Sequence, residues 1–241
     1  YVSRYANTVS VAMAGKFEIW WLELFAGPGM LYDRELNQYP MGSPLEALAL
    51  PKPFTGYVFA DASEECIDSL ERRIGTRPGV HIRRGDANDP AHLEAIAEII
   101  PRDALVIAYL DPEGLDLHFE TVRFLAWRYR RLDLLMNLPV HAIYREMSRD
   151  LASRSAAYVL PDRADGLGVG NLSDAIRARY RRGLRDLGYR EDMPGHLIRS
   201  HRNHAPQYDL FLASRSPMGA KLYRRATQNA VDGTRGLDVG C

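Results

Sequence analysis

The stretch WWLELFAGPGM, residues 20–30, decides the fold predicted for this chain. Residues 19–25 form an apolar, aromatic-rich run that ends abruptly in glycines, which is typical of the first strand of a parallel α/β sheet where it meets a ligand. Gly27 and Gly29 let backbone N–H groups approach a bound molecule because neither carries a Cβ. The acidic Glu23, near the end of this strand, favours a ligand with a positive charge over a phosphate. The alternative is an ordinary strand followed by a Gly-Pro turn, because short glycine motifs are weak signals.

The segment after the glycines separates this chain from most nucleotide-binding α/β domains. In those domains the helix begins directly at the glycines, whereas here a polar, tyrosine-bearing insert at 30–42 intervenes. A helix start follows, with Ser43 as the expected N-cap, Pro44 at the first helical position and Glu46 completing a capping box. We therefore predict that the insert is a mobile flap over the ligand.

Strands alternate with helices over the next part of the chain. The expected strands are 56–61, 80–84, 104–110 and 132–136, and the expected helices are 2–14, 63–74, 92–100, 119–130, 142–157 and 173–187. Two closing strands, 197–200 and 208–214, read as an antiparallel pair. The pattern predicts an α/β fold with a doubly wound, mostly parallel sheet. We expect one domain over 1–225 with a mobile loop at 161–171, little packing from Lys221 onward, and a C-terminal tail at 226–241.

Polar residues stand at the ends of successive predicted strands: Asp61, Asp86, Asp111 and Asn137. Ligands of doubly wound sheets bind outside the carboxyl ends of the strands, so this shared placement predicts one site. An acid in the position of Asp61 commonly accepts hydrogen bonds from ribose hydroxyls. Asp61 is also a candidate helix N-cap because Glu64 lies three residues on, and the two roles can hold together.

Charge and cysteine content narrow the functional classes. The net charge is zero, but residues 1–120 hold 10 Lys+Arg against 19 Asp+Glu, and residues 121–241 hold 21 against 12. The basic second half can face a polyanion, and the Arg-rich helix 177–185 and the cluster 128–131 are expected to flank the pocket mouth. Cys66, on a predicted helix, reads as a core residue, and Cys66 and Cys241 form no disulfide or metal pattern.

No metal, membrane or export signal is visible in the sequence. His201 and His204 lie three residues apart without a third ligand of suitable spacing, so we expect no metal site. No apolar stretch is long enough to span a membrane, and no secretory signal is present. We therefore expect a cytoplasmic protein with no membrane partner.

A series of motifs occurs in a fixed order across roughly residues 16–225: LELFAGPG (22–29), GSPLEAL (42–48), the acid of FADAS (61), GDAN (85–88), YLDPEG (109–114), LLMNLP (134–139) and YDLFLASRSPMGAKL (208–222). With these motifs the chain resembles a class I S-adenosylmethionine (SAM)-dependent methyltransferase with a Rossmann-like sheet. More narrowly, it resembles the three-Cys-motif partner protein family. The long insert after the glycines fits that family better than it fits methyltransferases at large. The resemblance also implies a cysteine-motif partner protein.

The resemblance implies roles for individual residues of the predicted site. The residues implied to bind the cofactor are Glu23, Phe25, Gly27, Gly29 and Ser43 toward the methionine end of SAM, Asp61 at the ribose, and Asp86 with Ala87 at the adenine. The residues implied to be catalytic are Asp111, Pro112 and Asn137, of which Asp111 and Pro112 would face the transferred methyl group. A sulfonium ligand also suits a site whose strand ends bear carboxylates.

One position departs from the pattern of related amino-methyltransferases. Glu113 stands where this family usually has an aromatic residue, so a stacking platform for a flipped base is missing there. Tyr109, Tyr144 or His141 could stack instead.

We therefore expect a SAM-dependent methyltransferase acting on an amine in RNA, DNA or another polyanionic substrate. The alternative is a SAM-binding methyltransferase-like module that works with the cysteine-motif partner protein. An NAD-linked dehydrogenase is disfavoured, because the glycines lack the Gly-x-Gly-x-x-Gly spacing and the next helix starts too late to meet a pyrophosphate.

Overall fold

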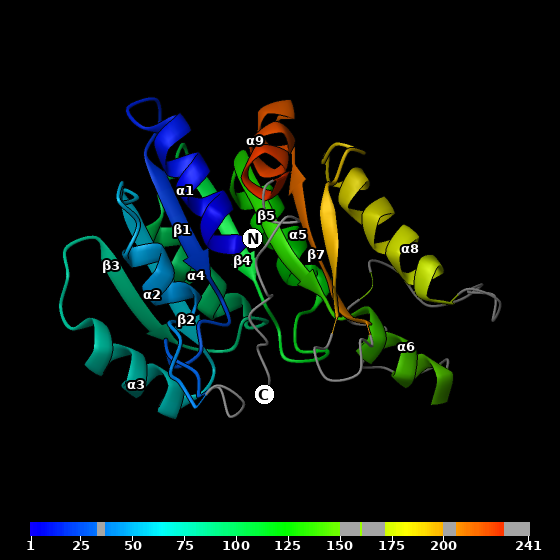
Figure 1. Ribbon diagram of the computed structural model, residues 1–241, viewed down its shortest axis with the longest axis horizontal. Coiled ribbons are helices and arrows are strands. Elements are labelled where there is room, and N and C mark those ends of the chain that lie inside the picture. The colour runs from blue at the N-terminus through cyan, green and yellow to red at the C-terminus, as the bar shows by residue number, and fades with distance from the viewer. Residues whose placement is uncertain (33–36, 150–159, 161–171, 200–205, 229–241) are drawn as a thin grey trace.

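A seven-stranded sheet in the order β3-β2-β1-β4-β5-β7-β6 forms the centre of the computed structural model, which describes residues 1–32, 37–149, 160, 172–199 and 206–228 (Figure 1). The strands are β1 Ile19–Glu23, β2 Gly56–Asp61, β3 Val80–Arg84, β4 Leu105–Leu110, β5 Arg131–Leu138, β6 Gly195–Arg199 and β7 Pro206–Ser214. Strands β1 to β5 pair in parallel, whereas β7 is antiparallel to both β5 and β6. The predicted doubly wound, mostly parallel sheet with antiparallel closing strands is confirmed.

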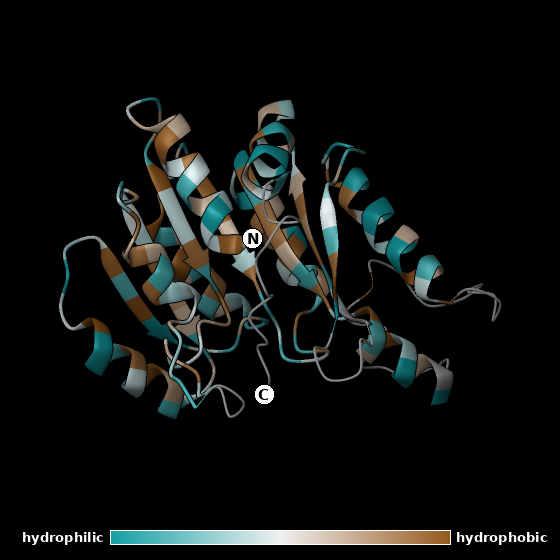
Figure 2. Cartoon of the chain, in the orientation of Figure 1, coloured by the Kyte–Doolittle hydropathy of each residue, from teal (hydrophilic) through white to brown (hydrophobic). Residues whose placement is uncertain are grey.

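Helices cover both faces of the sheet. They are α1 Val2–Met13, α2 Ser43–Leu48, α3 Glu64–Ile74, α4 Pro90–Ile99, α5 Phe119–Arg128, α6 Val140–Arg149, α8 Leu172–Asp186 and α9 Pro217–Thr227. One apolar core joins the sheet to α4, α5, α6 and α8, and a second joins its other face to α1, α2, α3 and α9. Figure 2 shows apolar residues along the strands and polar residues on the outer sides of helices such as α3 and α8. Burial of side chains on both faces explains why β1 reads as a continuous apolar run rather than an alternating one.

The start of α2 differs from the prediction by one residue. Gly42 is the N-cap, without a side-chain hydrogen bond, and Ser43 is the first helical residue. The prediction of Ser43 as N-cap is therefore wrong, and Glu46 completes no capping box. The physical reason is that Ser43 already belongs to the first helical turn and its hydroxyl points to Glu23, to which it donates a hydrogen bond at 2.8 Å.

The expectation of little packing from Lys221 onward is also wrong up to Thr227. That segment belongs to α9, whose N-cap Ser216 accepts a hydrogen bond from the backbone N–H of Met218. The Tyr223 side chain is 0% exposed, and its ring lies 5.6 Å from that of Tyr5 on α1. Helix α9 thus completes the second core. Residues 229–241, the predicted loop 161–171 and the second half of the predicted helix 142–157 lie outside the described residues.

Arg215, in the turn after β7, joins the ends of two helices. Its guanidinium donates to the carbonyls of Ala126 and Tyr129 at the end of α5 and to that of Leu187 just after α8, at 2.8–3.1 Å. The same guanidinium lies 4.8 Å from the centre of the Tyr189 ring. Helix ends leave carbonyls without intrahelical donors, so this one side chain satisfies groups on both helices and fixes α5 beside α8.

Candidate active site

The predicted site residues gather along one edge of the sheet. Glu23 ends β1, Asp61 ends β2, and Asp86, Asp111 and Asn137 lie at or just beyond the ends of β3, β4 and β5. These five parallel strands are neighbours, so their carboxyl ends meet at the same edge. The chain also reverses its winding between β1 and β4, which is the position where ligands bind doubly wound sheets.

The loop after β1 follows a path that glycine permits. Gly27 and Gly29 have φ angles of 60° and 80°, in the left-handed region. A Cβ on Gly29 would lie 2.7 Å from Cδ1 of Leu70. The backbone N–H of Gly27 donates to Oδ2 of Asp61 at 2.8 Å, so the acid of β2 fixes the glycine loop of β1. Phe25, before the loop, is partly buried against the first core.

Asp61 does not cap α3. Its Oδ1 accepts a hydrogen bond from the backbone N–H of Ser63 at 2.8 Å, and Ser63 in turn accepts from the backbone N–H of Cys66. Ser63 is the N-cap, so the alternative role of Asp61 as N-cap is wrong. Asp61 stays partly exposed, with oxygen lone pairs left for a ligand.

Glu23 is a fully buried carboxyl group, 0% exposed. Its oxygens accept hydrogen bonds from the indole N–H of Trp21 at 2.5 Å and from the Ser43 hydroxyl at 2.8 Å. Burial raises the pKa of Glu23 to about 8, the two hydrogen bonds lower it, and the nearby Asp111 and Glu46 raise it further. A carboxyl group with this pKa carries a proton through most of the neutral range and ionises readily once a cation lies beside it.

Asp111, Tyr109 and Asn137 form a hydrogen-bonded cluster at the ends of β4 and β5. The Tyr109 hydroxyl donates to Oδ2 of Asp111 at 2.8 Å, and Nδ2 of Asn137 donates to Oδ1 of Asp111 at 2.5 Å. Nδ2 of Asn137 also lies 3.1 Å from the Tyr109 hydroxyl. Burial raises the pKa of Asp111, and the two hydrogen bonds oppose that rise.

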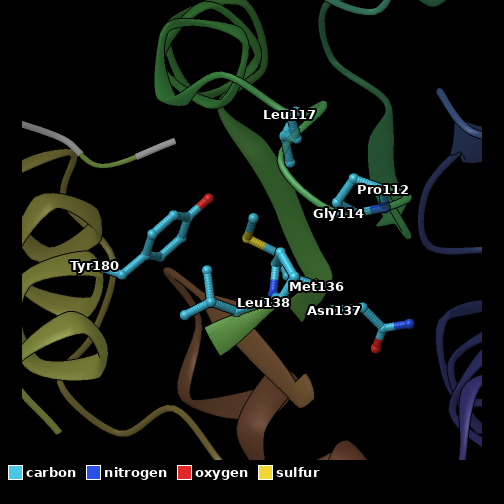
Figure 3. A pocket seen from close by; sticks show the side chains of 8 residues that line it. Pro112, Gly114, Leu117, Met136, Asn137, Leu138 and Tyr180 are labelled. Atoms are coloured by element: carbon cyan, nitrogen blue, oxygen red, sulfur yellow. The ribbon is translucent and has the colours of Figure 1, made fainter. Parts of the chain in front are cut away.

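The carbonyl oxygen of the Asn137 side chain is buried and has no hydrogen-bond partner among the described residues. Behind Asn137 lies a small cavity of about 10 Å³, lined by Pro112, Gly114, Leu117, Met136, Asn137, Leu138, Pro139 and Tyr180. Figure 3 shows Met136, Leu138 and Tyr180 close together, with the Asn137 amide pointing away from them. The amide therefore faces the Asp111 side of the sheet, and a buried acceptor without a donor calls for one from a ligand.

The turn after β3 is tied to the loop after β4. Oδ1 of Asp86 accepts from the backbone N–H of Asn88 at 2.8 Å, and the Asn88 amide donates to the carbonyl of Asp116 at 2.6 Å. The backbone N–H of His118 donates to Oδ1 of Asn88 at 2.9 Å. Ala87 is buried, whereas Asp86 is exposed and open to a ligand. Asn88 thus joins the loop after β3, which is expected to contact the adenine, to the loop after β4, which is expected to face the transferred methyl group.

Sequence reasoning missed the hydrogen-bonding roles of Trp21 and Tyr109. Tyr109 is 6% exposed and its ring lies 6.3 Å from that of Trp21, so it cannot stack on a substrate base and that suggestion is wrong. The signal available was the two-residue spacing, which puts Trp21 beside Glu23 and Tyr109 beside Asp111 on one face of the sheet. Tyr144 remains exposed.

The arginine clusters divide between the two edges of the sheet. Arg131 begins β5 and donates to the carbonyl of Asp103. Because β5 ends at the edge of the sheet that carries Asp111, the 128–131 cluster at its start lies at the opposite edge. Its predicted place at the pocket mouth is wrong. On α8, Arg177 forms an ion pair with Asp209, which lies beside the carboxyl end of β5.

Neither a metal cluster nor a membrane span is evident in the part of the chain that the structure describes. It contains no group of three or more His, Cys, Asp or Glu side chains able to hold a metal ion. No helix within the same residues has the length and apolarity needed to cross a bilayer. His201 and His204 are outside this part of the chain.

No family model and no curated protein matches the chain. Solved structures do. A DUF519 protein from Legionella pneumophila matches with a TM-score of 0.57 and 11% identity, covering 95% of this chain and 90% of its own. The trans-methyltransferase CalH, solved with SAH, matches with a TM-score of 0.50 and 18% identity, and the match covers 88% of this chain and 54% of CalH. Fibrillarin from Aeropyrum pernix, solved with SAM, matches with a TM-score of 0.50 and 13% identity, and the match covers 88% of this chain and 76% of the fibrillarin.

These likenesses establish the fold. The chain has a Rossmann-like methyltransferase sheet, mostly parallel, with antiparallel strands at one edge. The chain spans about half the length of CalH and most of the other two proteins. Membership of the three-Cys-motif partner family stays a prediction.

Proposed function

We propose that this protein is a SAM-dependent methyltransferase that transfers a methyl group to an amine in a nucleic acid or another polyanionic substrate. The observation that carries the proposal is the cluster of Asp111, Tyr109 and Asn137, in which the buried Asn137 carbonyl oxygen lacks a donor. An amine nitrogen supplies such donors. Because the Tyr109 hydroxyl and the Asn137 NH2 group already donate to Asp111, the cluster offers oxygen acceptors to a ligand, and these suit an amine better than a carboxylate or phosphate acceptor.

The residues present fit SAM. The glycine loop leaves open space where a Cβ on Gly27 would stand, so a ligand can approach the backbone closely. Asp61 has lone pairs free for ribose hydroxyls, and the buried Glu23 is a carboxyl group that a cationic ligand would ionise. CalH and the Aeropyrum fibrillarin were solved with SAH and SAM respectively, which supports the same cofactor here.

Bound SAM supplies a sulfonium methyl group: the N–CH3 bond forms as the S–CH3 bond breaks, sulfur keeps the bonding pair, and the amine becomes cationic. Asp111 accepts a hydrogen bond from the amine and stabilises that positive charge. The Asn137 carbonyl oxygen accepts the second N–H and so orients the lone pair, while Tyr109 and the Asn137 amide hold the carboxylate of Asp111 in place. Pro112 fixes the turn that aims Asp111. The surplus proton leaves to Asp111 or to water. Positioning of this kind contributes several kcal/mol.

Two measurements test the proposal. Calorimetric titration should show binding of SAM and none of NAD. Tritium from methyl-labelled SAM should then enter mixed RNA or DNA pools. Binding of NAD without SAM would reverse the assignment of the cofactor, and SAM binding without transfer to any pool would remove the nucleic acid as substrate.

We expect Asp61→Ala to weaken SAM binding by roughly 1–3 kcal/mol, the scale of lost charge-assisted hydrogen bonds. Asp61 both fixes Gly27 and is proposed to hold the ribose. Calorimetry on Asp61→Ala is compared with Asp68→Ala, an exposed acid on α3. Affinity equal to wild type in a folded Asp61→Ala protein would rule out the ribose role.

The described residues of the insert, 30–32 and 37–42, make few contacts. Met30 and Met41 form an isolated antiparallel bridge, and the Tyr32 hydroxyl donates to Oδ1 of Asn37 at 2.7 Å. The rings of Tyr32 and Tyr39 lie 4.9 Å apart, and both are exposed. Such a segment opens at low free-energy cost.

We therefore expect backbone amides across Leu31–Met41 to exchange hydrogen more slowly once SAM is bound, because the insert closes over the ligand. Hydrogen exchange is measured with and without SAM, and the amides of α5 serve as the internal control. Equal protection of the insert in both states would contradict its role as a flap.

The burial of the Asn137 carbonyl oxygen favours a second candidate function, because an acceptor reaches that oxygen only after the residues around it move. The second candidate is a SAM-binding module that acts together with a cysteine-motif partner protein. Methyl transfer by the isolated chain would eliminate it.

A further inference from the structure

A groove of about 310 Å³ lies between α5 and α8, apart from the residues proposed for methyl transfer. It is lined by Phe119, Arg123, Trp127, Arg179, Arg182, Gly183, Asp186 and Leu187. Both helices run from the carboxyl edge of the sheet toward the opposite edge, because Arg177 of α8 pairs with Asp209 at one end and Arg215 joins both helices at the other. The groove therefore runs alongside the sheet rather than across it.

Trp127 is the most exposed large apolar side chain among the described residues, 75% exposed. The other two tryptophans, Trp20 and Trp21, are 8% and 0% exposed. Core packing explains those two and does not explain Trp127. A large flat ring left open to water beside a groove is a surface on which a planar group can stack.

The groove is positively charged. Three guanidinium groups, from Arg123, Arg179 and Arg182, face a single carboxylate, Asp186. Arg182 is exposed and forms no ion pair with the residues that the structure describes. Within the described part of the chain, the one ion pair of Arg123 is with the exposed Glu120 on its own helix, a contact that contributes little stability. The charge balance favours an anionic occupant.

One end of the groove lies toward the carboxyl edge of the sheet. Helix α5 begins there at Phe119, shortly after the end of β4, and its last turn, with Trp127, lies toward the opposite edge. The Phe119 ring contacts the Tyr180 ring edge-on, with centroids 5.3 Å apart, and Tyr180 lines the small cavity behind Asn137 (Figure 3). A ligand lying along the groove therefore has its Phe119 end toward the edge that carries the candidate active site and its Trp127 end away from it.

We propose that this groove binds single-stranded nucleic acid, with one base stacked on Trp127 and phosphates on Arg123, Arg179 and Arg182. Arginine guanidinium groups interleaved with an open aromatic ring bind single strands in this way, largely without regard to sequence. From Phe119 to Trp127 the helix rises roughly 12 Å, which spans three or four stacked nucleotides at about 3.4 Å each. An acidic protein segment would satisfy the arginines but would leave the indole face open.

The inference deepens the proposed function by naming the substrate class, and it is tested without methyl transfer. A fluorescein-labelled, mixed-sequence 12-nucleotide RNA and its DNA counterpart are titrated with the full chain, and binding is followed by anisotropy. We expect Trp127→Ala to weaken binding roughly 5- to 150-fold, the range for loss of one stacked base. Trp127→Tyr retains an aromatic ring and should retain most of the affinity.

Arg182→Glu tests the charge, with Arg72→Glu on α3 as the matched control. Both arginines are exposed, but only Arg182 lines the groove. We expect Arg182→Glu to weaken binding and to reduce the salt dependence of log K by about 0.7 per lost phosphate contact. Arg72→Glu should change neither.

Intrinsic fluorescence gives a second readout, because Trp127 is the accessible indole. Unlabelled oligonucleotide should quench the wild type and leave Trp127→Phe unchanged. Failure of the wild type to bind, wild-type affinity in both groove variants, or displacement of the oligonucleotide by polyglutamate at equal charge concentration would overturn the proposal. Titration of the wild type and the same variants with SAM keeps the two questions apart. If the wild type does not bind SAM, the proposed function is refuted while the result for the groove stands.

Discussion

Between pH 5 and pH 8 the Glu23 carboxyl group is expected to lower the free energy of unfolding by about 4 kcal/mol, and Glu23→Gln is expected to abolish this decrease. Burial raises the pKa of Glu23 to about 8, so the folded state keeps a proton that the unfolded state releases near pH 4.5. Between these values the folded state binds more protons, and the free energy of unfolding falls by up to about 1.4 kcal/mol per pH unit. Glutamine can accept from the Trp21 indole through its carbonyl oxygen and donate from its NH2 group to the Ser43 hydroxyl, so it keeps both partners without titrating.

Urea denaturation at half-unit pH steps from 5 to 8.5 measures this effect as the difference between the two proteins. Other buried acids, such as Asp133, contribute to both curves and cancel in the difference. Glu65→Gln, an exposed substitution on α3, should give a curve parallel to wild type. Parallel curves for Glu23→Gln and wild type would show that Glu23 is already ionised in the folded state. If the pH effect is found, SAM binding near pH 7 should release a proton, visible as a binding enthalpy that depends on the buffer.

Replacing Asp111 with asparagine is expected to lower kcat for methyl transfer by about 10²–10³-fold while SAM affinity changes only a few-fold. Asparagine has a single acceptor oxygen, so it keeps the hydrogen bond from Asn137, while its NH2 group donates to the Tyr109 hydroxyl in place of accepting from it. The substitution removes the charge that stabilises the developing ammonium. Loss of one preorganised charge-stabilising group costs that much in other enzymes.

Methyl transfer from tritiated SAM to mixed RNA and DNA pools measures the effect of Asp111→Asn, and calorimetry measures SAM binding. Glu113→Gln is the matched control, because it changes an exposed acid two residues away. Equal rates for Asp111→Asn and wild type would move the reaction centre away from this cluster. A parallel loss of SAM affinity would make Asp111 a cofactor ligand instead.

The sequence predicted the sheet well because backbone pattern and position decide it. Buried strands such as β1 are almost continuously apolar, and the acids at or just after their ends stand at the edge where parallel strands end. Asp61, Asp86, Asp111 and Asn137 could be brought together from order along the chain alone. Their common edge required no knowledge of side-chain contacts.

Side-chain partners could not be predicted in the same way. Ser43 is of a residue type that commonly caps helices, but its hydroxyl donates a hydrogen bond to Glu23, a buried acid 20 residues earlier. Tyr109 reads as a possible stacking ring, whereas packing against Trp21 leaves only its hydroxyl active. Helix α9 packs through Tyr223 against Tyr5 of α1, more than 200 residues earlier in the chain. In each case a distant residue decides the outcome.

The three hydrogen bonds of Arg215 have a consequence for the order of folding during synthesis. Arg215 follows the α5 carbonyls that it satisfies by 86 and 89 residues. At 5–20 residues per second, a ribosome needs roughly 4–18 s to add that length. Until then the end of α5 must rely on water, so this part of the nascent chain remains open to chaperones and proteases. Contacts this distant along the chain also slow the final docking step.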